Sequence, residues 1–305
     1  MNVYLDYFQF PSPDDEFRQF VCGPYVFRMT CYKSFYPFKV LPDNIRELEM
    51  GSITILYGSN GSGKTTMLNV IAETLGINRS TKINKSAVMD HYVDLCDYSM
   101  IKHPDSLKMI TSDDVFSEIF LTREKNEIID KKRDELLDFK SECNIPEPEA
   151  LGIMMKKMIG DGNWIENIDV LRKIADAQNP NMTHSQYVNK WLEKNIKGKS
   201  NGETAMKYFA ENVNEPGLYL LDEPENSLSA SYQRQLSEYL FDSARFFGAQ
   251  LIISTHSPFM LSMPNALIYN LDAQKDFVTD DWTKLDGMKE YYKLFSKYAE
   301  EFEGR

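Results

Sequence analysis

The stretch "GSITILYGSNGSGKTTMLNVIAETLG", residues 51–76, decides the fold. Its first seven residues form a short, β-branched apolar run, which predicts a buried strand. Glycines follow, and a helix is expected from about Thr65, because Leu68, Ile71 and Leu75 fall on one helical face. A strand that passes through a glycine-rich turn into a helix is typical of an α/β fold.

The turn itself matches the pattern G-x-x-x-x-G-K-[ST] from Gly58 to Thr65. Glycines let the backbone turn tightly and direct its N–H groups at phosphate oxygens. Lys64 can then reach β- and γ-phosphates, the Thr65 hydroxyl can bind Mg²⁺, and the helix start adds a positive dipole end. A glycine-rich turn with an incidental lysine is disfavoured by the flanking strand and helix. We expect nucleotide contacts from the whole loop, namely Gly58, Ser59, Asn60, Gly61, Ser62, Gly63, Lys64, Thr65 and Thr66.

Two adjacent acids follow a second apolar run, in "LYLLDEPENSL", residues 218–228. Acids side by side at a buried strand end repel each other, so packing alone gives little reason to keep both. We expect Asp222 to hold the metal and Glu223 to polarise the attacking water as a general base. This pair indicates hydrolysis rather than simple nucleotide storage.

A third apolar run ends in a histidine, in "LIISTHSP", residues 251–258. His256 follows a predicted strand, as the phosphate loop does. It is therefore placed to contact the γ-phosphate and the attacking water, although a lone histidine is more often structural.

The three strands alternate with helices, which predicts a mostly parallel sheet covered on both sides. Between residues 80 and 205 the strand-like runs fade, and charged helical segments such as "SEIFLTREKNEIIDKKRDELLDFKSE" dominate. We therefore expect residues 1–79 and 206–305 to form the nucleotide-binding core and 80–205 to form an inserted helical subdomain. Sustained heptads are absent, so a long coiled-coil arm is not expected.

In this order, "GSNGSGKTT", "LYLLDEPENSL" and "ISTHSP" resemble the Walker A, Walker B with D-loop, and switch-histidine elements of ABC-type ATPases. The resemblance is strong near both ends of the chain and weak in the middle. Within that superfamily the chain is most similar to the soluble, SMC-like AAA-type ATP-binding proteins of bacteria. The resemblance implies a P-loop NTPase fold with an ABC-ATPase-like mixed sheet core, and ATP and Mg²⁺ as cofactors.

The resemblance also implies a signature motif that completes the site of a second subunit. The segment "KSNGETAMKYF", residues 199–209, offers Ser200 and Gly202 at the end of the expected insertion, with Lys199 and Asn201 replacing the usual leucine and first glycine. A helix N-cap at Ser200 with Glu203 three residues later explains the same residues. With the signature motif, a head-to-tail homodimer would form with ATP, and the D-loop residues 226–228 would cross its interface.

Two expected elements have no clear residue. The chain has no glutamine between Gln19 and Gln178, so Ser112 or Asp113 in "ITSDDVF" would have to meet the metal, or these two residues simply cap a helix. Tyr36 or Phe38 could stack on the base, or both could belong to the core. The choice between ATP and GTP stays open at this point.

The bulk composition limits the partners. Of the 305 residues, 46 are acidic and 34 basic, a formal net charge of −12, which disfavours a dedicated nucleic-acid binder. The basic segments "NRSTKINK" and "KNIKGKS" could form a local patch or a solvated face. The four cysteines lack a C-x-x-C pair, no run is long enough to span a membrane, and no signal peptide is recognised, which together predict a cytoplasmic protein without membrane insertion.

These features favour a cytosolic ATPase that couples ATP hydrolysis to a separate effector protein, a nuclease being one candidate, in nucleic-acid transactions or phage defence. The alternatives are the motor subunit of an ABC transporter and a nucleotide-gated scaffold with negligible turnover. The amphipathic segment "MKEYYKLFSKYAEEF", residues 288–302, could dock a partner or pack on the chain's own core.

Overall fold

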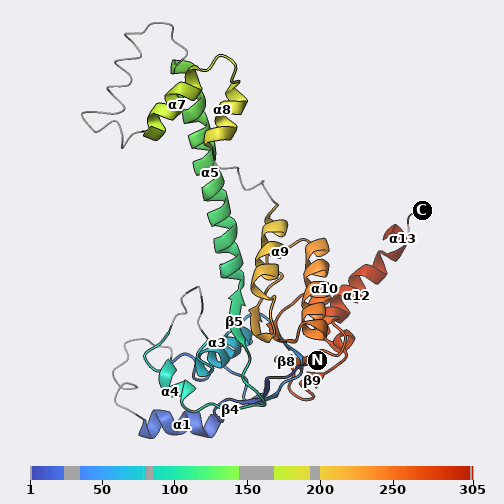
Figure 1. Ribbon diagram of the computed structural model, residues 1–305. Coiled ribbons are helices and arrows are strands. Elements are labelled where there is room, and N and C mark those ends of the chain that lie inside the picture. Colours follow the sequence, from blue (N-terminus) through green and yellow to red (C-terminus); the bar gives the residue numbers. More distant parts are fainter. Residues whose placement is uncertain are drawn as a thin grey trace. The chain divides into compact units, whose positions relative to one another are not determined.

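The structure is a computed structural model that describes residues 2–23, 35–77, 79, 81, 85–143, 168–192, 200–302 and 304. Contacts divide the chain into two compact units. Unit 1 comprises Met1–Ser117 and Asn201–Arg305, and unit 2 comprises Glu118–Ser200. Figure 1 shows the chain with many of its helices and strands labelled.

A six-stranded sheet forms the centre of unit 1, in the order β5-β6-β7-β3-β8-β9. All neighbouring strands are parallel except β8 and β9, as the apolar runs predicted. Every residue of β3, β6 and β7 is buried, which fits strands covered on both faces. The strands are β3 (Ile53–Tyr57), β5 (Ser106–Thr111), β6 (Gly217–Asp222), β7 (Ala249–Ser254), β8 (Leu267–Asn270) and β9 (Val278–Thr279).

A smaller antiparallel sheet lies in the same unit. It has the order β2-β1-β4, formed by β1 (Leu5–Gln9), β2 (Glu47–Glu49) and β4 (Asp97–Met100). Strands β4 and β5 lie between residues 80 and 205, where the sequence predicted few strands. Their residues are partly exposed, so neither strand carries the continuous apolar run that marks β6.

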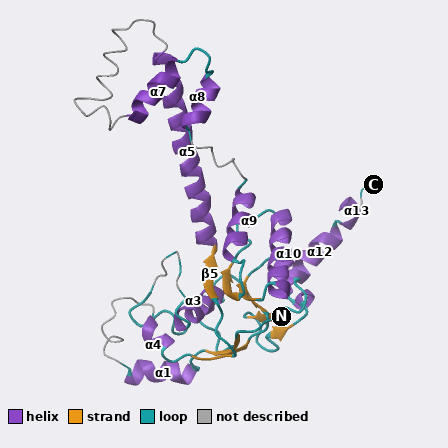
Figure 2. Cartoon of the chain, in the orientation of Figure 1, coloured by secondary structure: helices purple, strands orange, loops and turns teal. Residues whose placement is uncertain are grey.

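Helices pack against the main sheet, which Figure 2 shows as the orange strands with purple helices around them. Helix α3 (Lys64–Thr74) contacts β6 and β7, and its buried residues join one large core with Phe8, Leu218 and Ile252. Helix α10 (Ala230–Phe246) contacts β7, α11 (Pro258–Leu261) and α9 (Asn201–Asn212). The remaining described helices of unit 1 are α1 (Pro13–Cys22), α4 (Met89–Val93), η1 (Trp282–Lys284), α12 (Asp286–Lys297) and α13 (Ala299–Phe302).

Helix α5 (Ser112–Cys143) begins in unit 1 and continues into unit 2, which also contains α7 (Ile168–Gln178) and α8 (His184–Trp191). A small core of Cys143, Ala177, Tyr187 and Val188 holds the helices of unit 2 together. The subdomain limits expected from the sequence, 80 and 205, stay a prediction. Pro146, Pro148 and most of "KNIKGKS" lie outside the described residues, as do Lys82 and Cys31.

The amphipathic segment 288–302 does form helices α12 and α13, but most of its apolar side chains face solvent. Met288 is buried, whereas Tyr292 is 73% and Phe302 71% exposed. The prediction that this segment packs on the chain's own core is therefore correct only for the start of α12, near Met288.

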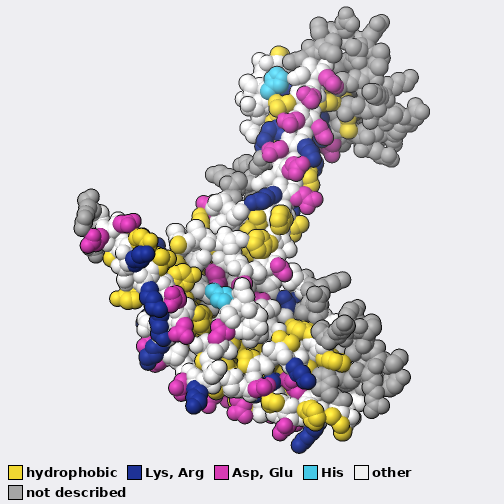
Figure 3. All heavy atoms as spheres, turned by 180° about the vertical axis from the view of Figure 1, so that it is seen from behind, with side chains coloured by type: hydrophobic (Ala, Val, Ile, Leu, Met, Phe, Trp, Pro, Cys, Tyr) yellow, Lys and Arg dark blue, Asp and Glu magenta, His cyan; other side chains and the backbone are white. Residues whose placement is uncertain are grey.

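The surface fits the acidic composition. Acidic and basic side chains are interspersed on the face in Figure 3, with hydrophobic side chains in several separate patches. Arg79 donates to the Asn69 side chain at 2.5 Å, and Lys85 is paired with Glu73, so these two members of the first basic segment already have partners inside the chain. Within the described ranges, no helix combines the length and apolar character needed to span a membrane.

Candidate functional site

The loop between β3 and α3 needs its glycines. Gly61 and Gly63 have φ of 84° and 100°, in the left-handed region that other residues rarely adopt. A Cβ atom on Gly58 would lie 2.6 Å from the Ser62 hydroxyl oxygen. The glycine spacing thus produces a loop that wraps closely on itself before α3 begins at Lys64.

Lys64 lies at the centre of this loop with only 4% of the residue exposed. Its ammonium donates to the carbonyls of Gly58 and Ser59, at 2.8 and 3.1 Å, and to Nε2 of His256 at 2.8 Å. An ammonium can only donate, so the imidazole is the acceptor in the last contact. Burial lowers the pKa of Lys64, and nearby carboxylates, Glu223 foremost, oppose that effect.

Asp222 ends β6 beside the first turn of α3. Its Oδ1 accepts hydrogen bonds from the hydroxyls of Thr65, at 3.0 Å, and Ser254. Burial raises the pKa of the Asp222 carboxyl, and these two hydrogen bonds oppose the rise. A carboxylate and a hydroxyl at this distance are ligands of the kind that Mg²⁺ takes.

Glu223, the next residue, has a φ of 47°, a left-handed conformation that is strained for a side chain of this size. Its N–H donates to the carbonyl of Ser254 at 3.0 Å, and its Oε2 accepts from the Asn226 amide at 2.8 Å. Its Oε1 lies 3.8 Å from Nε2 of His256. Strained residues of this kind concentrate at functional sites, and here the carboxylate of the strained residue lies near the histidine.

His256 lies two residues after the end of β7, so the parallel pairing of β7 with β3 and β6 brings it to the same edge of the sheet. Its ring lies edge-on to Tyr57 with 6.2 Å between centroids. Burial and then the Lys64 ammonium lower the pKa of His256, with Glu223 and Asp272 opposing. The histidine is therefore held in its neutral form, as an acceptor for Lys64 requires.

A pocket of about 260 Å³ opens beside the loop. It is lined by Val40, Asn60, Gly61, Gly63, Lys64, Thr65, Thr66 and Glu223. Of the two aromatic candidates for base stacking, Phe38 is 3% exposed and packs edge-on against Tyr92 in the core. The structure thus favours the core alternative for Phe38, and Val40 is the apolar side chain that reaches the pocket.

Comparison with known families decides the identity of this arrangement. The family model described as "ABC transporter" matches residues 44–226, more than half of the 305-residue chain. The chain belongs to this family. A second family model, described as "AAA domain, putative AbiEii toxin, Type IV TA system", matches residues 208–262, which include Asp222, Glu223 and His256. Family membership implies ATP binding, typically with Mg²⁺.

Solved structures of low identity accompany the family matches. The Smc head domain with an extended coiled coil, bound to the C-terminal domain of ScpA from Pyrococcus furiosus, has 13% identity and a TM-score of 0.38, covering 97% of this chain and 100% of that one. "An inward-facing conformation of a putative metal-chelate type ABC transporter" has 17% identity and a TM-score of 0.37, covering 90% and 82%. An SmcHead bound to the C-winged helix domain of ScpA has 15% identity and a TM-score of 0.39, covering 87% and 93%. No curated protein matches the chain.

Ser200 and Gly202, the two residues predicted to form a signature motif, are not among the residues that line the pocket beside Lys64. Ser200 is exposed and directly precedes α9, and Gly202 is buried in its first turn. A Cβ atom on Gly202 would lie 2.3 Å from the Tyr232 ring on α10. Close packing of α9 on α10 therefore explains the glycine without a nucleotide, and the signature role remains a prediction.

Ser112 and Asp113, the two residues expected to substitute for the missing glutamine, differ in their exposure to solvent. Asp113 is exposed, Ser112 is half-buried, and neither provides the helix cap. Instead Asp114 accepts from the N–H and hydroxyl of Thr111, both at 2.8 Å, as a capping box does. Thr111 is the register partner of Asp222, so this cap lies beside the acidic pair.

Two further acids at this edge were not singled out from the sequence. Asp272, after β8, accepts from the N–H and hydroxyl of Ser59 at 2.6 and 2.9 Å and so braces the phosphate loop. Glu225 accepts from the segment that carries His256. The only signal for Glu225 was its place as the third acid of "DEPE".

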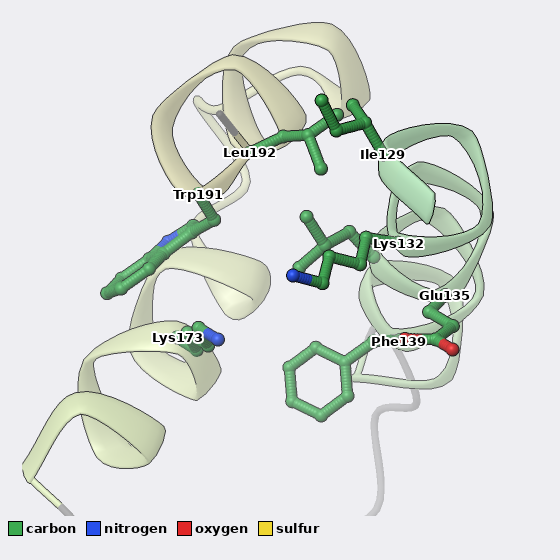
Figure 4. A pocket seen from close by; sticks show the side chains of 8 residues that line it. Ile129, Lys132, Glu135, Phe139, Lys173, Trp191 and Leu192 are labelled. Atoms are coloured by element: carbon green, nitrogen blue, oxygen red, sulfur yellow. The ribbon is translucent and has the colours of Figure 1, made fainter. Parts of the chain in front are cut away.

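A second cavity, of about 490 Å³, lies within unit 2 and is shown in Figure 4. Its lining combines the Phe139 and Trp191 rings with the amines of Lys132 and Lys173. The Trp191 indole N–H donates to Asp176 at 2.9 Å, and the Lys173 amine lies 5.4 Å from the Trp191 ring centre. These contacts are internal to unit 2 and add nothing to the site at the strand ends.

Proposed function

We propose that the chain binds ATP with Mg²⁺ at the carboxyl edge of its main sheet and hydrolyses it. The observation that carries this proposal is two sets of contacts at one edge of the sheet: His256 lies between Lys64 and Glu223, and Thr65 donates to Asp222. Five residues from three separate parts of the sequence meet there with the chemistry that phosphoryl transfer to water requires.

The loop would hold the phosphates. Its backbone N–H groups and the start of α3 favour negative charge, and Lys64 would exchange its contact with His256 for the β- and γ-phosphate oxygens. Asp222 and Thr65 would hold Mg²⁺, whose charge would neutralise the phosphates. Among the described residues, no group of three or more His, Cys, Asp and Glu is arranged to hold a metal, so phosphate oxygens would complete the coordination.

Glu223 would polarise the attacking water, since its carboxylate faces the pocket from a fixed and strained backbone. His256, already held near both Lys64 and Glu223, would keep the water and the γ-phosphate in line. As a neutral imidazole it can both donate and accept a hydrogen bond, which suits a position between an oxyanion and a water.

A head-to-tail homodimer is part of the proposal. Because Ser200 and Gly202 do not line the pocket of their own chain, a second copy would supply them, and residues 226–228 would lie at the contact. Coupling to a separate effector protein, in nucleic-acid transactions or phage defence, is the finer proposal. The description of the second matched family, which names a toxin–antitoxin system, supports a module of two proteins.

The description of the matched family, "ABC transporter", also supports one alternative function, the motor subunit of a transporter. ATP turnover that responds to DNA or RNA would favour the nucleic-acid role. Turnover that responds only to a membrane partner would favour the transporter. The scaffold alternative requires ATP binding without turnover.

The variant Glu223→Gln tests the proposal directly. Loss of the general base should lower kcat by about 10²- to 10⁴-fold while ATP still binds. Light scattering after size-exclusion chromatography should then show a dimer with ATP and Mg²⁺ and a monomer without them. Glu238→Gln is the matched control, because Glu238 is an exposed acid on α10 paired with Arg234.

Equal turnover in Glu223→Gln and wild-type protein would remove Glu223 from the mechanism. A wild-type protein that binds ATP but never turns it over would support the scaffold instead. A monomer under both conditions would contradict the shared site.

A further inference from the structure

Glu225 is the most deeply buried acid of the segment that follows β6. It is 7% exposed, and burial raises the pKa of its carboxyl while hydrogen bonds from Thr255 and His256 oppose the rise. Burying such a group costs free energy unless hydrogen bonds compensate for the lost contact with water.

All three described side-chain contacts of Glu225 use one oxygen and one neighbouring segment. Oε1 accepts from the Thr255 hydroxyl at 2.6 Å, the His256 N–H at 2.8 Å and the Ser257 N–H at 3.2 Å. The second oxygen, Oε2, is buried and has no partner among the described residues. One oxygen of the carboxylate thus binds the Thr255 side chain and the backbone N–H groups of His256 and Ser257.

The same segment is tied back to the D-loop. The Leu228 N–H donates to the Glu225 carbonyl at 3.0 Å. The Ser257 hydroxyl donates to Gln233 at 2.8 Å, and the Gln233 amide donates to the Leu228 carbonyl at 3.0 Å. These bonds close a ring that includes residues 225–228 and 255–257.

We propose that Glu225 is a positioning residue that fixes the His256 backbone and makes residues 225–228 and 255–257 move as one body. A change at residues 226–228 would then reach His256 through Glu225 and Ser257. The claim that Glu225 fixes the position of His256 does not depend on any reaction. The claim that this position affects catalysis rests on the proposed ATP hydrolysis.

The distances explain why a small shift matters. The imidazole Nε2 lies 2.8 Å from the Lys64 ammonium and 3.8 Å from the Glu223 carboxylate, so a displacement of about 1 Å would break the first contact. Misplacement of that size can lower a catalytic rate by about 100-fold. Glu225 contacts His256 through the backbone N–H rather than the imidazole, so its proposed effect on the ring is one of position.

Glu225→Gln and Glu225→Ala separate positioning from stability. The glutamine keeps an oxygen at Oε1 and places its amide where Oε2 finds no partner, so it should lose stability yet still hold His256. The alanine removes the acceptor from three donors, so it should lose both. Gln250→Ala is the control for stability alone, because Gln250 is an equally buried hydrogen-bonding hub that contacts Tyr4, Leu5 and Gly51 instead.

The first readout needs no turnover. In nucleotide-free protein labelled with ¹⁵N-histidine, His256 resonances are assigned by their loss in His256→Gln. Acceptance from Lys64 at Nε2 requires the tautomer with hydrogen on Nδ1, and we expect that signature in wild-type, Glu225→Gln and Gln250→Ala proteins. Glu225→Ala should instead show the tautomer mixture of an unconstrained histidine.

The second readout is kinetic. Glu225→Ala should lower kcat by about 10- to 100-fold with KM for ATP changed less than about 3-fold, and Glu225→Gln should stay within about 3-fold in both. A wild-type protein without turnover but with the expected histidine spectra would reject the proposed function and retain the positioning role.

An unchanged His256 spectrum in Glu225→Ala overturns the proposal, as does a Glu225→Gln protein that behaves like the alanine variant. If Glu225→Ala does not fold, Glu225→Asp takes its place, because the carboxylate is then withdrawn by one methylene. That variant should shift the His256 signals in the same direction by less, and unshifted signals would again reject the proposal.

Discussion

A buried hydrogen-bonding side chain lies at each end of β7, Gln250 on the strand itself and Glu225 from the segment after β6, and the two hold different parts of the chain. At the amino end, Gln250 accepts from the N–H groups of Tyr4 and Leu5, at 2.8 and 2.9 Å, and donates to the carbonyls of Leu5 and Gly51, at 2.6 and 2.9 Å. It therefore joins the start of the small sheet to the main one. At the carboxyl end, Glu225 holds the segment that carries His256.

The two ends differ in whether their polar side chains can contact a ligand. All four contacts of Gln250 end on backbone groups, which are thereby satisfied. At the other end, Lys64, Glu223 and His256 meet beside a pocket. Carboxyl ends of parallel strands gather at one edge, where ligands of open α/β sheets bind. The amino edge of this sheet thus supports the fold, and the carboxyl edge supports the proposed reaction.

Lys64→Ala, which changes the site at the carboxyl end of β7, should have the largest effect of these variants. Its ammonium would make charge-assisted hydrogen bonds to the β- and γ-phosphates, each worth roughly 1.5–3 kcal/mol, so ATP affinity should fall by about 10²- to 10⁴-fold. Titration with a fluorescent ATP analogue measures the loss. The unfolding temperature should change little, because the lysine is a buried charge whose removal relieves desolvation.

Undiminished ATP affinity in Lys64→Ala would reject the phosphate loop as the binding site. A large fall in unfolding temperature would instead show that Lys64 supports the fold, and the contrast between the two ends of β7 would disappear.

Gln250→Ala, at the amino end of β7, should have the opposite effect to Lys64→Ala: it should lower stability and leave ATP affinity nearly unchanged. The truncation leaves two N–H groups and two carbonyls without their side-chain partner, and each unsatisfied buried group costs about 1–3 kcal/mol before relaxation and water entry. We expect the free energy of unfolding to fall by about 2–4 kcal/mol, measured by chemical denaturation. ATP affinity should stay within about 3-fold of wild type, because the pocket lies at the other end of the strand.

The parts of the fold that could be predicted are those with a local signal. Strands β3, β6 and β7 are continuous apolar runs, and the Gly61 and Gly63 spacing needs no tertiary context. Strand β5 was missed because "SLKMIT" includes a serine, a lysine and a threonine and is in part only half-buried, at the edge of the sheet, so pairing with β6 rather than composition decides its structure.

The site follows the same division. Lys64, Asp222, Glu223 and His256 were expected from motifs, and the structure brings them together, although their roles stay predictions. Glu225 and Asp272 were missed because each acts through contacts with a distant segment, 30 or more residues away. Gly202 was interpreted only as a signature residue, because its contact with Tyr232 depends on how α9 packs on α10.

The pH dependence of stability gives the smallest effect and tests the carboxyl end alone. Burial and Lys64 hold the pKa of His256 below its ordinary 6.5, while Glu223 and Asp272 oppose them and the Tyr57 ring packs edge-on. The unfolded chain then takes up this proton at a higher pH than the folded chain. Stability from this group is present above pH 6.5 and is lost as pH falls from there toward the folded pKa.

Asp222 and Glu225 contribute with the opposite sign, because burial raises the pKa of each carboxyl, so their contribution weakens as pH rises. Both remain in His256→Gln, so the comparison with wild type isolates the histidine. When the pH is lowered from 7.5 to 5.5, the denaturation midpoint should fall more in wild-type protein than in His256→Gln. The difference between the two proteins should be smaller than the loss of stability in Gln250→Ala. Equal pH dependence in the two proteins would show that His256 is not held neutral by its surroundings, and the contact with Lys64 would lose its physical basis.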